Sequence, residues 1–318
     1  MIDISLRYYE PSAGVSLYYQ HWIPENPKSL LVFVHDLGDH LGRYTSFIKY
    51  FIDNNYAVAL YDQRGHGRSR NKKFSSSARF EDYISDLSKF LCFSRSRVKK
   101  ELPVFLIGQG FGAQIIINLL VPGVDKFNDD NIINPGEMAG FVTLSAYIAP
   151  IIKGFHIDEY IKTKLSKIYP HWLVKSIINP ENLSNNPDVI RNYTRDNLVT
   201  RRMSLTLKQQ ILSNTEFIIP MSARIRIPAL MLHGKKDQIS AYTGTSDFVS
   251  RLPSISKKMH LYEDYKHDLM NELDNQIIFK DIENWLQNNI TVFSNKDKKV
   301  AKKKKESLCD LPLFSLQV

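Results

Sequence analysis

Short apolar runs alternate with longer amphipathic segments along most of the chain. The apolar runs predict strands at residues 15–22, 30–34, 57–61, 104–107, 140–144, 229–232 and 258–262. Between them, three- and four-residue spacing of apolar side chains predicts helices at residues 44–53, 80–95, 111–120, 241–251 and 272–287. Short buried strands that alternate with helices indicate a mostly parallel sheet with helices on both faces. The pattern therefore predicts a three-layer α/β fold.

Two segments interrupt this alternation. Residues 123–137 are rich in Asp, Asn, Pro and Gly, which predicts a surface loop. Residues 147–226 contain helical patterns at 157–169 and 201–217, and we expect this insertion to form a helical cap over the carboxyl ends of the strands, where open α/β sheets bind ligands. The expected organisation is a core of residues 1–146 and 227–290, a cap of residues 147–226 and a tail of residues 291–318.

Composition is that of an ordinary globular protein. The chain has 318 residues, of which 43% are hydrophobic and 24% charged. It contains no apolar run of the length that a membrane span requires, and its first residues lack the pattern of a secretory signal, so we expect a cytoplasmic protein. Cys92 and Cys309 do not have metal-ligand spacing, and we expect neither a metal nor a cofactor.

Much of the net charge of +9 comes from the tail. Seven lysines lie beyond residue 295, against three acidic residues. The simplest interpretation is a solvated, disordered extension, because repelling charges without apolar spacing do not order themselves. The alternative is attraction to an anionic surface, and we expect peripheral contact with a membrane through the cap or the tail rather than specific binding of nucleic acid.

The most informative turn lies within residues 104–113, VFLIGQGFGA. An apolar strand enters a glycine-rich turn that opens a helix, as in the G-x-S-x-G pattern, whose central serine is a nucleophile on a sharp strand-to-helix turn. Here Gly110 lies at the centre of the turn and has no side chain.

Further polar loops follow other predicted strands. Residues 35–44 (HDLGDHLGRY) and 62–69 (DQRGHGRS) follow the second and third, while Asp237 and His267 follow the last two. A nucleophile turn is thus followed along the chain by an acid and then by a histidine. This is the order of the catalytic triad in α/β-hydrolases. In such a triad His267 would accept a hydroxyl proton and Asp237 would orient its imidazole.

These motifs resemble the monoacylglycerol lipase and lysophospholipase branch of the α/β-hydrolases, which is grouped with the serine aminopeptidase S33-like proteins. The family's H-G-x-G-E-H-x-x-R-Y loop is similar to residues 35–44, and its D-x-R-G-H-G-x-S matches residues 62–69. Its cap-exit motif R-D-P-L-V is similar to residues 195–199, RDNLV. The resemblance covers residues 15 to 288.

The resemblance implies an acyl pocket under the cap and no cofactor. It assigns the nucleophile position to Gly110, the acid to Asp237, the base to His267, and the two backbone amides of an oxyanion hole to Leu37 and Phe111. Three residues near the reaction centre depart from the family pattern, namely Gly110 for serine, Gln109 for histidine and Asp36 for glycine. A carboxylate at position 36 would oppose the developing negative charge that the amides stabilise.

Loss of the serine changes the expected function. Removal of a triad serine lowers turnover by about 10⁶-fold, so we expect a pseudoenzyme that binds an acyl or other apolar ligand, or a partner. One alternative is a weak carboxylic-ester hydrolase in which His267 activates a water molecule directly. Another is a dinucleotide-binding oxidoreductase, because Gly108, Gly110 and Ala113 also satisfy G-x-G-x-x-A. The next strand carries no ribose-binding acid at its end, which argues against it.

Overall fold

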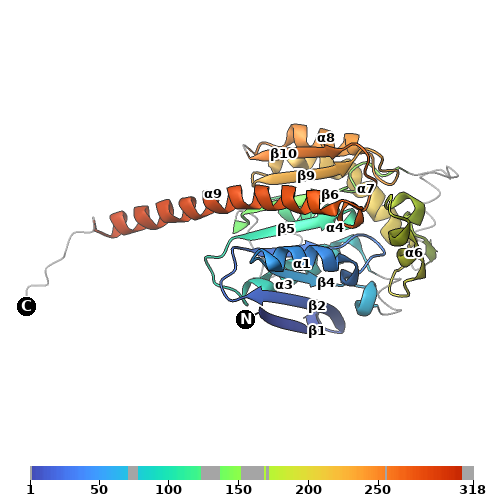
Figure 1. Cartoon of the computed structure of the whole chain (residues 1–318), viewed down its shortest axis with the longest axis horizontal. Helices are drawn as coiled ribbons and strands as arrows, with labels where there is room; N and C mark the ends of the chain where they lie inside the picture. The colour runs from blue at the N-terminus through green and yellow to red at the C-terminus, as the bar shows by residue number, and fades with distance from the viewer. Residues whose placement is uncertain are drawn as a thin grey trace, which may run out of the picture.

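An eight-stranded sheet runs through the centre of the protein (Figure 1). This computed structural model describes residues 2–70, 78–122, 137–151, 168–169, 172–254 and 256–309. The spatial order of the strands is β1-β2-β4-β3-β5-β6-β9-β10. Their bounds are β1 Ile2–Ser12, β2 Val15–Pro24, β3 Leu30–Val34, β4 Ala57–Tyr61, β5 Val104–Gln109, β6 Gly140–Leu144, β9 Ala229–Gly234 and β10 Lys257–Tyr262.

Most of the sheet is parallel. The strands from β4 to β10 pair in parallel, whereas β1 and β2 join as an antiparallel hairpin at one edge. Because parallel strands share a direction, the loops after β3, β5, β9 and β10 leave the sheet at the same end. This arrangement brings the predicted polar loops together.

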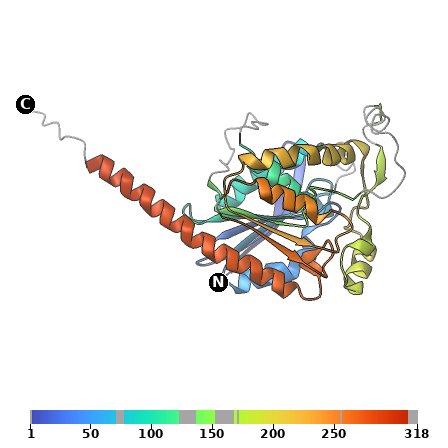
Figure 2. The same ribbon diagram turned by 90° about the horizontal axis from the view of Figure 1, so that it is seen from above.

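Helices cover both faces of the sheet, as Figure 2 shows from above. One apolar cluster lies under α3, α4 and α8, and the other lies under α1 and α9. The predicted three-layer α/β architecture is therefore confirmed. The helix bounds are α1 Thr45–Asp53, α3 Phe80–Arg95, α4 Phe111–Leu120, α8 Tyr242–Arg251 and α9 Asn275–Cys309.

The segment between β6 and β9 forms elements outside the main sheet. They are β7 Leu173–Lys175, α6 Pro187–Arg195, β8 Arg202–Ser204 and α7 Leu205–Met221. The helix predicted at 201–217 begins later than expected, because the Ser204 side chain accepts a hydrogen bond from the Leu207 amide and caps α7. Its Ile211 is buried in the same cluster as α4. The helix predicted at 157–169 and the loop predicted at 123–137 lie almost wholly outside the described residues.

The two ends of the chain differ from expectation. No element was predicted for residues 2–12, yet Ile2, Ile4, Leu6 and Tyr8 alternate with polar residues, which is the period of a strand. At the other end, α9 continues to Cys309 (Figure 1), beyond the end of the helix predicted at residues 272–287 and into the segment for which a disordered tail was predicted. Lysine, alanine and glutamate are good helix formers, and this segment contains neither glycine nor proline to end the helix.

Candidate functional site

The turn between β5 and α4 brings the helix amino terminus close to the ends of neighbouring strands. Gly110 has φ +52° and ψ −110°, a conformation that favours glycine. Its amide donates a hydrogen bond to the Leu144 carbonyl on β6 at 2.9 Å. Two residues later, Gly112 lies so close to the carbonyls of Val34 and His35 that a Cβ would overlap them. The glycines of this turn therefore allow α4 to approach β3.

Asp237 and His267 lie beside this turn and contact each other. The Nδ1 atom of His267 is 2.8 Å from the Oδ2 atom of Asp237. The other carboxylate oxygen of Asp237 accepts hydrogen bonds from the amides of Ile239 and Ser240, at 2.7 and 3.0 Å. Both side chains are fully buried. The structure thus brings together the acid and the base that the resemblance implies.

Asp36 reaches into the same place from the loop after β3. Its Oδ1 atom accepts hydrogen bonds from the amides of Leu37 and Phe111, at 2.6 and 2.8 Å. Its Oδ2 atom lies 3.0 Å from the Nε2 atom of His267. The two amides that the resemblance assigns to an oxyanion hole therefore hold a carboxylate of the chain itself. Sequence reasoning identified Asp36 as a departure from the family pattern but did not predict these contacts of its side chain.

The protonation of His267 follows from its two neighbours. Each ring nitrogen faces a carboxylate oxygen, and an ionised carboxylate can only accept a hydrogen bond. Burial alone would lower the pKa of His267, but the charges and hydrogen bonds of Asp237 and Asp36 outweigh it and raise the pKa to about 10. His267 is therefore an imidazolium that donates to both carboxylates.

The two carboxylates differ in their own titration. Burial would raise the pKa of Asp237, but the positive charge of His267 and the hydrogen bonds from His233 and His267 hold this pKa below its ordinary value. Burial raises the pKa of Asp36, and hydrogen bonds from His267 and the two amides oppose that shift only in part. Asp36 is therefore the weaker acid of the two.

A second buried network lies under the site. Gln109 donates from Nε2 to the Oδ1 atom of Asp268 at 2.8 Å. Arg43 bridges the Oδ2 atom of Asp268 at 2.8 Å and the Oδ2 atom of Asp39 at 2.9 Å. Sequence reasoning missed Asp268, although it is the residue next to His267. Because Gln109 precedes Gly110 directly, this network fixes the end of β5 where the turn begins.

Residues 196–200, which precede β8, contact the loops around the site. His40 contacts the Asp196 carboxylate at 2.8 Å, and the Thr200 amide donates to the Gly38 carbonyl at 2.7 Å. Arg70 donates to the carbonyls of Asn197 and Leu198, at 3.1 and 2.8 Å. The Leu41 amide also donates to the Oδ1 atom of Asp62 at 2.8 Å, so the motifs at residues 35–44, 62–69 and 195–199 meet in space.

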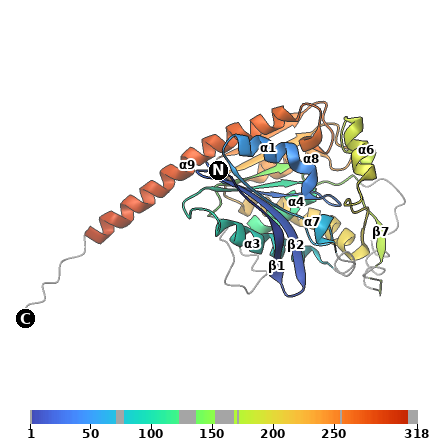
Figure 3. The same cartoon turned by 60° about the horizontal axis from the view of Figure 1, so that its bottom comes forward.

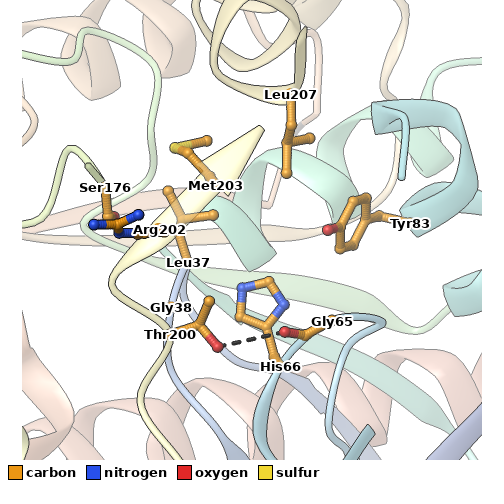
Figure 4. A pocket seen from close by; sticks show the side chains of 10 residues that line it. All are labelled: Leu37, Gly38, Gly65, His66, Tyr83, Ser176, Thr200, Arg202, Met203 and Leu207. Atoms are coloured by element: carbon orange, nitrogen blue, oxygen red, sulfur yellow. Dashed lines mark hydrogen bonds between the residues drawn. The ribbon is translucent and has the colours of Figure 1, made fainter. Parts of the chain in front are cut away.

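The cavity beside Leu37 is small. A cavity of about 10 Å³ lies next to Leu37, between His66, Tyr83, Met203 and Leu207 (Figure 4). This volume is enough for about one water molecule. A second cavity of about 390 Å³ lies near the Asp237 loop, and its lining includes Ile151, Lys175, Ile178, Lys208 and Ile239.

The described residues form neither a metal cluster nor a membrane span. Within the part of the chain that the structure describes, no three His, Cys, Asp or Glu side chains gather as a metal site would require. Over the same residues, no helix has the length and apolar character needed to cross a bilayer.

Comparisons with known proteins agree with this architecture. The model of the family described as serine aminopeptidase, S33 matches residues 25–274. A monoglyceride lipase homolog of Monkeypox virus is 27% identical over 86% of this chain and 95% of its own length. Human monoglyceride lipase is 24% identical, over 86% of this chain and 87% of its own length. The chain spans only 27% of the length of another relative, an uncharacterized abhydrolase domain-containing protein of Dictyostelium discoideum that is 26% identical.

Solved structures share the fold. The monoacylglycerol lipase of Paleococcus ferrophilus superposes with a TM-score of 0.74 at 24% identity, covering 86% of this chain and 99% of that one. A soluble variant of monoglyceride lipase from Saccharomyces cerevisiae, in complex with a substrate analog, has a TM-score of 0.76 at 18% identity and covers 90% of this chain and 96% of its own. The fold is that of the α/β-hydrolases, and the chain belongs to the serine aminopeptidase S33 family.

Proposed function

We propose that this protein is a member of the family that does not hydrolyse esters through an acyl-enzyme, and that it binds an acyl or other apolar ligand. One observation carries the first part of the proposal. The Asp36 carboxylate bonds to the amides of Leu37 and Phe111 and to His267 at the same time. These are the groups that an attacking hydroxyl and a developing oxyanion would both need.

Three requirements of the acyl-enzyme route fail together. Gly110 offers no side-chain nucleophile. His267 already carries its proton and donates from Nε2 to Asp36, so it cannot accept a hydroxyl proton there. The amide pair is occupied by the Asp36 side chain before any substrate arrives. Because the loss of a triad serine alone costs about 10⁶-fold in turnover, the combined loss abolishes this chemistry.

The same contacts weigh against the two alternatives. Direct activation of water needs a neutral Nε2 that faces the water, whereas Nε2 of His267 faces Asp36. Binding of a dinucleotide needs the amides at the start of α4 for the diphosphate. The Phe111 amide is already bonded to Asp36, whose charge would repel a phosphate.

The larger cavity supports the ligand part of the proposal. Its volume of about 390 Å³ lies within the usual size of small-molecule sites, which is roughly 300 to 1,000 Å³. Ile151, Ile178 and Ile239 provide apolar surface, and Lys175 and Lys208 provide positive charge. Such a lining suits an apolar chain with an anionic or polar end.

The catalytic part is tested with monoacylglycerols and p-nitrophenyl acyl esters. We expect background hydrolysis from the wild type and from Gly110→Ser and Asp36→Gly alone. The double variant Gly110→Ser/Asp36→Gly should gain on the order of 10³-fold, because it supplies the nucleophile and clears the amides. Addition of His267→Ala should remove the gain. Turnover by the wild-type protein that His267→Ala abolishes would instead support hydrolysis by an activated water.

The ligand part is tested by titration with a fluorescent fatty acid and by competition with monoacylglycerol. We expect saturable binding that Ile151→Asp, in the lining of the cavity and 36% exposed, weakens by at least about tenfold. Ile168→Asp is the matched control, because Ile168 is 64% exposed. Equal binding by both variants would contradict a ligand site in this cavity.

A further inference from the structure

The free edge of strand β1 has the features of a pairing surface. β1 forms one end of the sheet, and among the described residues it pairs only with β2 (Figure 3). A strand at a sheet edge presents backbone N–H and C=O groups that another strand can pair with. The matched family region begins at residue 25, so this hairpin lies outside it.

One side of β1 is apolar and open to solvent. Ile2, Ile4, Leu6 and Tyr8 are 44%, 55%, 52% and 58% exposed, although they form a continuous row along the strand. Tyr8 continues this row onto the sheet by an edge contact with Tyr18, with ring centroids 5.5 Å apart. Side chains of alternate residues lie on one face of a strand, so Asp3, Ser5 and Arg7 occupy the opposite face. On that face Arg97 contacts Asp3 and Ser5.

The first part of this edge strand is regular, and Pro11 and the register irregularity lie at its far end. Residues 2–8 contain no proline and no lysine, and their register with β2 is regular until the irregularity between Tyr9 and Ser12. The opposite edge of the sheet differs, because β10 begins with the exposed residues Lys257 and Lys258. Lysines on an edge strand oppose pairing with another chain.

We propose that the occupant of this edge is a second copy of the same chain, whose β1 pairs antiparallel with the first and places Ser5 opposite Ser5. In this register Ile2 faces Tyr8 and Ile4 faces Leu6 on the apolar side. On the other side Asp3 of each copy faces Arg7 of the other. Opposite charges and apolar side chains in directly facing positions stabilise antiparallel pairs.

Charge complementarity selects this register. Successive side chains of a strand point to opposite faces of the sheet. A symmetric pairing of two β1 strands can therefore shift only in steps that keep each side chain on its own face. A shift in one direction places Asp3 opposite Tyr9, and a shift in the other places Asp3 opposite Ser5. The register centred on Ser5 is the one that joins Asp3 to Arg7. Pairing would produce one continuous sheet across a two-fold axis.

Sedimentation and light scattering of the full chain over a range of concentrations provide the first test. We expect a dimer. Asp3→Arg and Arg7→Asp each place like charges opposite each other and should raise the dissociation constant about tenfold. The double variant Asp3→Arg/Arg7→Asp restores opposite charges and should restore the dimer. Arg97→Ala is the control, because it removes the contact with Asp3 inside one chain.

Cross-linking tests the register. In a chain with Cys92→Ser and Cys309→Ser, we expect Ser5→Cys to form an intermolecular disulfide under mild oxidation and Ser12→Cys not to. A monomer at all concentrations, a dimer that neither single charge variant weakens, or a failure of the double variant to rescue would each overturn the proposal. A monomer that binds anionic vesicles and loses that binding in Leu6→Asp would overturn it in favour of a lipid surface.

Discussion

The Asp36 carboxylate occupies the space into which a side chain at Gly110 would project. A Cβ built on Gly110 would overlap the Oδ1, Cγ and Oδ2 atoms of Asp36. The lack of a side chain at position 110 therefore leaves the space that the carboxylate of Asp36 occupies. A serine at position 110 requires Asp36 to move or to be replaced.

This relationship predicts an unequal cost for two glycine substitutions. Gly14 has φ +76° and no atom within 4 Å of the position that a Cβ would take, so Gly14→Ser should cost about 1 kcal/mol for backbone strain alone. Gly110→Ser adds the overlap with Asp36 and should cost about 3 kcal/mol. Urea unfolding measures both. In a chain that already carries Asp36→Gly, the loss of unfolding free energy caused by Gly110→Ser should fall toward the loss caused by Gly14→Ser. An unchanged loss would contradict the steric overlap between Asp36 and a side chain at position 110.

The charge of His267 should depend on Asp36. Asn at position 36 can accept from the two amides and donate to Nε2, so we expect Asp36→Asn to fold and to leave His267 neutral at pH 7.5. ¹⁵N chemical shifts of labelled histidine distinguish the two states. The wild-type His267 should be an imidazolium under the same conditions. A neutral His267 in the wild type would refute a bonding pattern in which both ring nitrogens donate.

Stability should fall as the solution becomes alkaline. The pKa of His267 is raised from 6.5 to about 10 in the folded protein, so the stability it provides is complete below pH 6.5 and is lost as pH rises through 10. We expect the difference in the free energy of unfolding between wild type and His267→Gln to shrink over this window, by an amount on the order of a few kcal/mol. A difference that is constant with pH would contradict the raised pKa.

The buried Arg43 should matter more for stability than an exposed lysine whose carboxylate partner is also four residues away. Arg43→Met leaves the carboxylates of Asp39 and Asp268 without their shared cation and should destabilise the protein by about 3 to 5 kcal/mol. Lys49→Met removes the exposed Lys49–Asp53 pair and should change stability by less than about 1 kcal/mol. Thermal and urea unfolding of both variants test this contrast.

The layers of the fold could be predicted because apolar periodicity determines them directly. The runs at 30–34, 57–61 and 140–144 became β3, β4 and β6 with the predicted bounds. Strand β1 was missed because alternation over residues 2–8 was not considered, although the signal is present in Ile2, Ile4, Leu6 and Tyr8.

The candidate site could be predicted only as a set of loops. Strand order brings Asp237 and His267 together, and the resemblance assigned them their positions. The rotamer of Asp36 depends on the distance between two loops that are 75 residues apart in sequence, measured from Asp36 to Phe111. No local pattern encodes this distance, nor does one encode the bond between Gln109 and Asp268.

The steric exclusion between positions 36 and 110 also sets the order in which the two residues can be exchanged in the laboratory. A serine introduced at position 110 while Asp36 keeps its contacts meets the carboxylate, whereas a serine introduced after Asp36→Gly does not. Of the two single variants, Asp36→Gly is therefore the better intermediate on the way to the double variant.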